Sequence, residues 1–184
     1  TIADGVIPTA PMLPDSEYLG LVGPGVQFGD IDEALLSSKQ NNSELATWRV
    51  NPNALHVPVH TGAGQFRAVG RTVALGYLPT IRNKLSQKFD LLNQPDSQSS
   101  LSELFHFVHD APPTANTAGP IVIVVSSLAG GTGAGLINDV CDVIRELDPV
   151  NGDGSFGLLY TPEVFEGVVP KGGGIQPNSL AAIS

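Results

Sequence analysis

The sequence predicts an α/β fold with a mostly parallel sheet, and three neighbouring segments carry this prediction. Residues 121–126 lack polar alternation, which is typical of a parallel strand that is covered on both faces. Residues 136–147 repeat apolar side chains at helical spacing, so we expect a helix with a broad buried face. Residues 156–160 predict a second strand. A strand, a helix and a strand in this order make a βαβ unit, which is right-handed.

The composition indicates one acidic globular domain. The 184 residues are enough for a sizeable core, and 41% hydrophobic with 15% charged residues is typical of a globular chain. Asp and Glu total 18 against 9 for Lys and Arg, and the net charge of -9 argues against a broad surface for nucleic acid or anionic membranes. No apolar run reaches membrane-spanning length. Cys141 is the only cysteine, which excludes an internal disulfide and favours a cytoplasmic protein.

The two ends of the chain favour a piece of a longer protein. There is no initiator Met and no signal peptide, and residues 177–184 follow a helix-like pattern to the last position. We therefore expect the domain to be incomplete at both ends.

Upstream of the βαβ unit, the pattern predicts a loop followed by short elements. Residues 1–29 are rich in Pro and Gly and should be mostly loop, with a short strand at 18–22. Asp30 is expected to cap a helix that runs to Leu36. Residues 55–59 predict another short strand.

Two longer helical segments follow. A helix is expected from about Phe66 towards Phe89, and Pro79 should kink or divide it, because proline lacks a backbone donor. Ser99 or Ser100 could cap a further helix that ends near Asp110.

A glycine-rich stretch, residues 126–135, joins the first predicted strand to its helix. Ligands of open α/β sheets bind beyond the carboxyl ends of the strands, and a helix N-terminus there offers unpaired N–H groups to phosphate. The glycines permit positive φ and a close approach of the backbone to an anion, and Thr132 adds a hydroxyl donor. The stretch therefore predicts a phosphate site, and a glycine-rich turn without a ligand is the alternative.

Two common nucleotide motifs do not fit this stretch. A P-loop requires a lysine, which is missing here. The dinucleotide fingerprint requires a third glycine where Leu136 stands, and an acidic residue where Thr161 and Pro162 follow the second strand. An NAD-dependent enzyme is therefore the weaker hypothesis.

The same stretch resembles a family signature. Residues 129–135 read AGGTGAG and match the [SAG]-G-G-T-G-[SA]-G signature of the tubulin/FtsZ family. In that family the loop wraps the phosphates of GTP or GDP. The resemblance implies nucleotide-binding roles for Ala129, Gly130, Gly131, Thr132, Gly133, Ala134 and Gly135.

An upstream segment carries a second part of the resemblance. Residues 62–71, GAGQFRAVGR, are similar to the FtsZ form G-A-G-G-N-P-x-x-G-R. The family loop contacts the terminal phosphate, which implies phosphate contacts from Ala63, Gly64 and Gln65. Gln65 and Phe66 depart from the family form.

Two downstream segments supply candidates for contacts with the nucleoside. Residues 160–167, YTPEVFEG, resemble the FtsZ form T-K-P-F-x-F-E-G, whose acidic residue contacts the ribose. This implies that role for Glu166, and a solvated loop acid is the alternative. Residues 177–184, PNSLAAIS, are similar to the family segment whose Asn reads the guanine edge. Asn178 is the candidate, because an amide offers both a donor and an acceptor, and a helix cap is the alternative.

The resemblance is closest to the divergent bacterial tubulin-like proteins, and it implies a Rossmann-like three-layer domain of the tubulin/FtsZ nucleotide-binding type. Residues 1–184 would form part of one GTP-binding domain, with phosphate loops at 62–65 and 129–135 and no second domain. The family's first nucleotide loop and long central helix have no counterpart in these residues. The implied ligands are GTP or GDP, with Mg²⁺ shared by phosphates and water.

The resemblance also implies an activity for the full-length protein. It would be a GTPase that self-associates into filaments, with the catalytic acid supplied by a domain outside this chain. We therefore expect no catalytic residue and no metal ligand in this chain. A nucleotide-binding scaffold that does not polymerise is the alternative.

Charged side chains near the loops leave further alternatives open. Arg67 and Arg71 could reach phosphate or form a helix-surface pair. Asp139 and Asp142 favour a solvated helix face over a catalytic pair of carboxylates.

Overall fold

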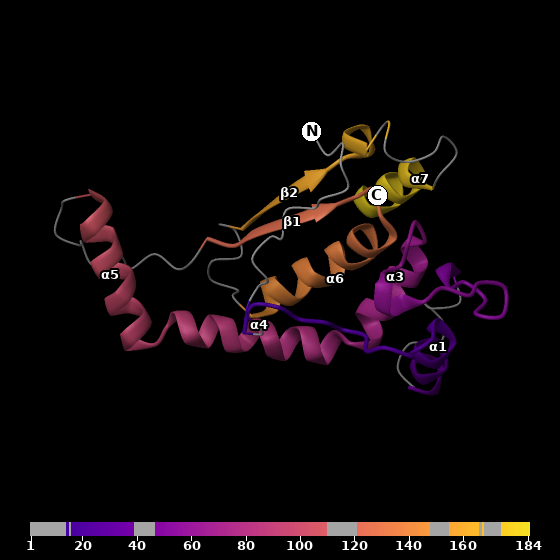
Figure 1. Cartoon of the computed structure of the whole chain (residues 1–184), viewed down its shortest axis with the longest axis horizontal. Helices are drawn as coiled ribbons and strands as arrows, with labels where there is room; N and C mark the ends of the chain where they lie inside the picture. The colour runs from indigo at the N-terminus through magenta and orange to yellow at the C-terminus, as the bar shows by residue number, and fades with distance from the viewer. Residues whose placement is uncertain are drawn as a thin grey trace, which may run out of the picture.

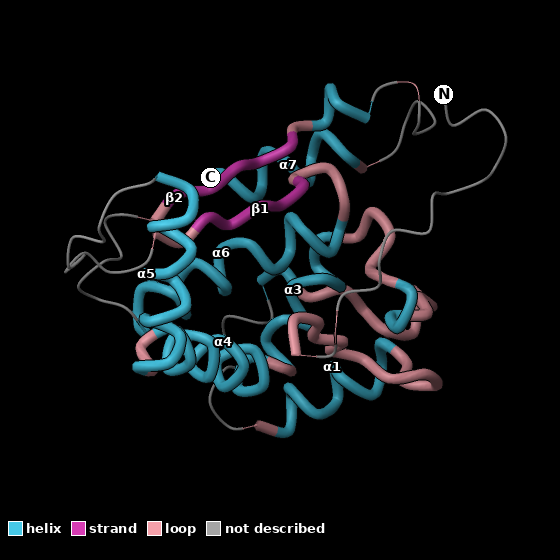
Figure 2. Tube along the Cα trace, turned by 60° about the vertical axis from the view of Figure 1, so that its left-hand side comes forward, coloured by secondary structure: helices cyan, strands magenta, loops and turns pink. Residues whose placement is uncertain are grey.

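The computed structural model describes residues 14, 16–38, 47–109, 121–147, 155–165, 167 and 174–184. Helices predominate, and the small sheet lies at one side of the molecule, with most of the helices on one side of it (Figures 1 and 2). The elements in chain order are α1 (Phe28–Ser37), the 3-10 turn η1 (Val59–Thr61), α3 (Arg67–Gly76), α4 (Leu78–Leu92), α5 (Pro95–His109), β1 (Ile123–Ser127), α6 (Gly131–Leu147), β2 (Phe156–Tyr160), the 3-10 turn η3 (Pro162–Phe165) and α7 (Ile175–Ile183).

The predicted βαβ unit is confirmed. β1 and β2 pair in parallel, in a register that runs from Ile123 opposite Phe156 to Ser127 opposite Tyr160. α6 connects the two strands and lies along one side of them (Figure 1). The chain therefore has the α/β class that the sequence predicts, with a two-stranded parallel sheet in its described part.

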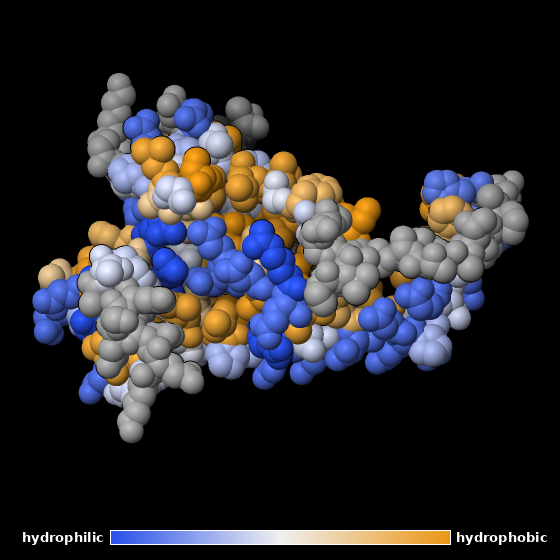
Figure 3. Space-filling model, turned by 180° about the vertical axis from the view of Figure 1, so that it is seen from behind, coloured by the Kyte–Doolittle hydropathy of each residue, from blue (hydrophilic) through white to orange (hydrophobic). Residues whose placement is uncertain are grey.

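Only one face of this sheet is covered by the described residues. Val124 packs towards α6, against a cluster that contains Leu128 and Ile137. Ile123 and Val125 alternate with Val124, so they point to the other face, where they are 53% and 58% exposed. In Figure 3 the hydrophobic band along the upper side of the molecule lies over these strands. Among the described residues the strand is covered on one face, and coverage of both faces stays a prediction.

Two hydrophobic clusters position the loops that flank the sheet. The first joins α1, α3 and the segment before α3, and its buried members are Phe28, Ile31, Val57, Val59, Ala63, Val69 and Val73. The second joins the loop after β1 to α6 and α7, with Leu128, Ala134, Ile137 and Ala182 buried. Because Ala63 belongs to the first cluster and Leu128 to the second, each loop has an apolar anchor in its own core.

α3 and α6 pack on each other through glycines. A Cβ atom added to Gly70 would lie 2.1 Å from the carbonyl oxygen of Gly131. One added to Gly135 would lie 2.6 Å from the backbone nitrogen of Arg71. Real Cβ atoms do not approach backbone so closely, so the backbones of the two helices are in direct contact here. This contact brings the start of α6 against the residues that precede α3.

The helical predictions hold, with shifted ends. α3 ends at Gly76 and α4 begins at Leu78, with Pro79 in its first turn, so proline divides the helices as expected. α5 begins at Pro95 and not at a serine cap, and it ends next to the expected Asp110. α1 begins at Phe28, before Asp30.

The N-terminus of α1 also uses Asp30 differently from the prediction. Asp30 is the third residue of the helix, and its carboxylate accepts the backbone N–H of Gln27 at 2.9 Å. The acidic group therefore satisfies a backbone donor at the helix start without being the cap residue.

The two short strands predicted upstream are wrong. Residues 18–22 and 55–58 have no regular secondary structure, and Val59 begins a 3-10 turn. Leu21, Val22 and Leu55 instead pack as partly buried side chains on the cluster between α1 and α3. The apolar residues of these segments are therefore explained by loops that pack on a core, and not by strands that pair in a sheet.

We predict that Gly70→Ala destabilises the fold, although Ala normally stabilises a helix by about 1 kcal/mol relative to Gly. The added methyl group must displace the carbonyl of Gly131, and overpacking of this kind costs about 1–3 kcal/mol. Urea unfolding of the two proteins measures the difference. Gly23→Ala is the control, because its Cβ would meet nothing within 4 Å. Equal stability of Gly70→Ala and wild type would contradict the direct backbone contact.

Candidate functional site

The glycine-rich stretch is a short loop followed by a helix start. β1 ends at Ser127, residues 128–130 form the loop, and α6 begins at Gly131. The predicted loop residues 131–135 are therefore the first turn of α6, and only Ala129 and Gly130 of the predicted set lie outside it. The stretch sits at the carboxyl end of β1, where the sequence placed it.

The glycines of this stretch are needed for close packing and not for unusual torsion angles. Positive φ occurs nearby at Gly62 (117°) and Gly64 (56°), and at none of the glycines in 126–135, so that part of the prediction is wrong. A Cβ on Gly131 would lie 2.6 Å from the backbone nitrogen of Phe66, and one on Gly133 would lie 2.2 Å from the carbonyl oxygen of Ser127. The close approach that the glycines allow is thus to other backbone segments of the protein.

The two predicted phosphate loops are in direct contact. The backbone N–H of Gly131 donates to the carbonyl oxygen of Gly64 at 2.7 Å. The backbone N–H of Ala63 donates to the hydroxyl oxygen of Thr132 at 3.0 Å. The structure therefore brings together two loops that lie far apart in the sequence.

At the start of α6, the backbone donors of Thr132 and Gly133 have no partner among the described residues. The first bond of the helix runs from the N–H of Ala134 to the carbonyl oxygen of Gly130, at 3.1 Å. Among the described residues, no group accepts a hydrogen bond from the N–H groups of Thr132 and Gly133. Thr132 is exposed and Gly133 is half-buried. These donors and the positive end of the helix dipole can attract an anion.

Asn178 connects α7 to both loops. Its side-chain nitrogen donates to the carbonyl oxygen of Gln65 at 2.7 Å and to that of Ala129 at 3.0 Å. Both partners are carbonyl oxygens, so the orientation of the amide is fixed and Oδ1 is its remaining acceptor. Asn178 is 7% exposed and lies inside α7, with its backbone N–H bonded to Gly174, so the helix-cap alternative is wrong.

Gln65 makes a second connection to the start of α7. Its side-chain oxygen accepts the backbone N–H of Gly174 at 2.7 Å. The resemblance implies a phosphate contact for Gln65, but its side chain is engaged within the protein. The separation of 109 residues left no sequence signal for this bond.

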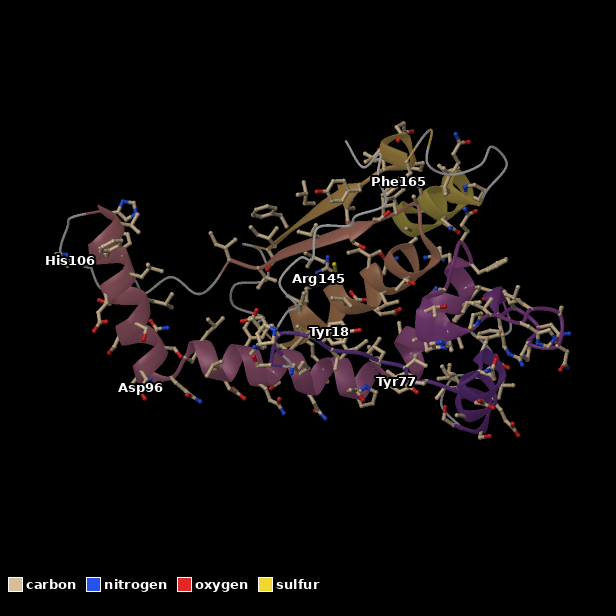
Figure 4. All side chains as sticks on the ribbon, in the orientation of Figure 1. Tyr18, Tyr77, Asp96, His106, Arg145 and Phe165 are labelled. Carbon is tan, nitrogen blue, oxygen red and sulfur yellow. The ribbon has the colours of Figure 1, made fainter. Side chains whose placement is uncertain are left out.

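Glu166 lies outside the described residues, so its contact with ribose stays a prediction. Its neighbour Phe165 ends η3, which follows β2 (Figure 4).

The two arginines after the upstream loop face α6. Arg67 donates through Nε to the carbonyl oxygen of Ala134 at 3.1 Å. Arg71 lies 4.0 Å from a carboxylate oxygen of Asp139, and its guanidinium lies 4.8 Å from the ring centre of Trp48. Both side chains therefore contact protein groups at the junction of α3 and α6.

Asp139 is enclosed at this junction, so the predicted solvated face is wrong for it. Its side chain is 13% exposed, and its Oδ2 has no hydrogen-bond partner among the described residues. Burial raises the pKa of Asp139, and the nearby Arg71 only partly offsets this effect. Burial likewise lowers the pKa of Arg67. Asp142 is exposed and pairs with Arg145, as a solvated face predicts.

A groove of about 480 Å³ lies apart from this site, between α1 and residues 49–57. At its wall the guanidinium of Arg49 holds the buried carboxylate of Asp32 through two hydrogen bonds. This ion pair joins residue 49 to α1, and no pattern in the sequence predicts it.

The described ranges contain no group of three or more His, Cys, Asp or Glu side chains that could hold a metal ion. None of their helices is both long and apolar enough to cross a membrane.

We predict that Asp139 contributes less to stability as pH rises. Its pKa in the folded protein is raised, so the contribution is fully present below the ordinary pKa of about 4 and is lost as pH rises through the folded pKa. The free energy of unfolding of wild type minus that of Asp139→Asn should therefore fall as the pH rises above about 4. Urea unfolding at several pH values measures it. A difference that grows with pH would mean that Arg71 outweighs desolvation.

Comparison with known proteins identifies the family. No curated protein and no solved structure gives a significant match to the chain. A family model described as tubulin-like matches residues 25–184, which include the loops at 62–65 and 129–135 and all of α7. This match covers most of the sequence and agrees with the resemblance of the glycine-rich stretch. The chain therefore belongs to the tubulin-like family.

Proposed function

We propose that this chain binds GTP and GDP at the junction of the 62–65 loop, the start of α6 and α7. The observation that carries the proposal is the pair of unpaired N–H groups at Thr132 and Gly133, which lie at the carboxyl end of β1. Membership of the tubulin-like family supports a nucleotide as the anion.

In the proposed complex, phosphate oxygens accept the N–H groups of Thr132 and Gly133. The hydroxyl of Thr132 already accepts from Ala63, and its own proton remains available to a phosphate. Gly64 is exposed beside it and is the upstream candidate for a phosphate contact. The net charge of -9 does not oppose this binding, because the attraction comes from local dipoles and donors.

The base would be read by Asn178. Both of its N–H groups are engaged by Gln65 and Ala129, so Oδ1 accepts from the ligand. The N1–H and 2-amino groups of guanine are donors, and adenine has neither. Glu166 remains the candidate for the ribose hydroxyls.

Mg²⁺ would be held by phosphate oxygens and water, which matches the ion's preference for phosphate ligands. We propose that the full-length protein is a GTPase that self-associates into filaments, with its sheet completed to a Rossmann-like three-layer domain. Catalysis would then use an acid outside this chain. A cytoplasmic location remains a prediction from the single cysteine, Cys141.

A scaffold that binds nucleotide without polymerising is the second candidate. The bonds from Gly131 to Gly64 and from Ala63 to Thr132 hold the two loops together within the protein itself. Because these hydrogen bonds hold the two loops in place, the loops keep their arrangement without GTP hydrolysis. Sedimentation of the full-length protein with GTP separates the candidates, since only the first predicts filaments and hydrolysis.

We predict that Gly130→Asp weakens GDP binding and leaves the fold stable. Gly130 precedes α6, so an aspartate there would cap the helix and occupy the N–H groups offered to phosphate. The capping should keep or raise the melting temperature, while its charge repels phosphate. Calorimetric titration with GDP measures the affinity.

Gly130→Ala is the matched control. Its Cβ would meet only the carbonyl oxygen of Gly64, at 3.9 Å, so fold and binding should both be retained. Unchanged GDP affinity in Gly130→Asp would contradict the proposed phosphate site.

A further inference from the structure

Gln65 bonds to the first turn of α7 at two points. Its side-chain oxygen accepts the N–H of Gly174, which directly precedes α7. Its backbone oxygen accepts the side chain of Asn178, one turn later. A single residue of the upstream loop therefore holds both the backbone and the candidate base-reading side chain of this helix.

We propose that Gln65 is a positioning residue that sets the guanine selectivity of the site. The inference rests on the proposed function, because it concerns the same site. It assigns to Gln65 a role through Asn178 and not a phosphate contact.

The two ends of the site depend on Gln65 to different extents. The phosphate end is connected by the bonds from Gly131 to Gly64 and from Ala63 to Thr132, and neither uses the side chain of Gln65. At the base end, the amide of Asn178 donates to the backbone oxygens of Gln65 and Ala129. The turn of α7 that carries Asn178 is held by the bond from the N–H of Gly174 to the side-chain oxygen of Gln65. Loss of the Gln65 side chain should therefore affect base recognition and spare the phosphate contacts.

Within the part of the chain that the structure describes, the side-chain hydrogen bonds at the start of α7 join it to Gln65 and Ala129. Leu180 and Ile183 are 68% and 67% exposed, and the apolar anchor of the helix is Ala182 in its last turn. Gly174 lies so close to the loop that a Cβ there would be 3.4 Å from the carbonyl oxygen of Gln65. The first turn is thus held by polar bonds, and the bond from Gln65 fixes its backbone.

Gln65 departs from the family form of this loop. A side chain with an acceptor is required for the bond to Gly174, and the amide oxygen of Gln65 supplies it. The bond between the 62–65 loop and α7 is therefore made by a residue that the family form does not have at this position.

The test compares Gln65→Met with Gln65→Glu in the full chain. Met keeps the length of the side chain and removes the oxygen acceptor, while Glu keeps an acceptor for the N–H of Gly174. The probes are GDP, ADP and inorganic tripolyphosphate, each titrated by calorimetry. The readout is the ratio of the GDP affinity to the ADP affinity. A change in phosphate binding alters both affinities by the same factor, so it leaves this ratio unchanged.

We predict that Gln65→Met lowers this ratio by about tenfold, the size expected when one hydrogen bond no longer orders a binding group. Tripolyphosphate affinity should stay within about twofold of wild type, which also shows that the variant is folded. Gln65→Glu should keep the wild-type ratio, because its negative charge lowers the affinities for GDP and ADP by the same factor.

A double variant supplies the second readout. If Gln65 acts through Asn178, then adding Gln65→Met to Asn178→Ala should change the ratio no further. Independent, additive effects would overturn the inference, and so would a wild-type ratio in Gln65→Met. A wild-type chain that binds tripolyphosphate but does not prefer GDP to ADP would refute the proposed guanine site, and with it this inference.

Discussion

The close contact between the backbones of residues 63–71 and 131–135 is the constraint on which the rest of the structure depends. Glycine at 70, 131 and 135 removes the Cβ atoms that would separate the two segments, and the bond from Gly131 to Gly64 then joins them. This contact sets the position of the α6 N-terminus relative to the upstream loop. Because Ala129 and Gln65 are held on either side of it, Asn178 can bond to both and bring α7 to the same place.

The proposed anion site is compatible with an acidic chain, because its donors are backbone N–H groups and not free cations. The nearby arginines are already engaged: Arg67 bonds to Ala134, and Arg71 lies between Asp139 and Trp48. They stabilise the junction of α3 and α6, and the unpaired N–H groups of Thr132 and Gly133 remain for a ligand. A site of this kind depends on the geometry of the helix start more than on net charge.

The sequence predicted what depends on local pattern and left out what depends on distant contacts. The βαβ unit could be predicted because its apolar strands, its helical spacing and its glycine-rich loop all lie within about forty residues, which is the length of one such unit. The strands expected at 18–22 and 55–59 failed because apolar residues on a loop that covers a core look like a short strand. The burial of Asp139 and the bond from Gln65 to Gly174 arise from tertiary packing, for which a single sequence gives no signal.

The most direct test of the account follows the backbone amides of Thr132 and Gly133 by two-dimensional NMR while GDP is added to the full chain. If the start of α6 binds the phosphates, these two signals shift saturably. The signal of the Asn178 side-chain amide moves in the same titration, and ADP produces smaller changes at Asn178. Shifts confined to other parts of the chain, with Thr132 and Gly133 unchanged at saturating GDP, would contradict the claim that the start of α6 binds the phosphates.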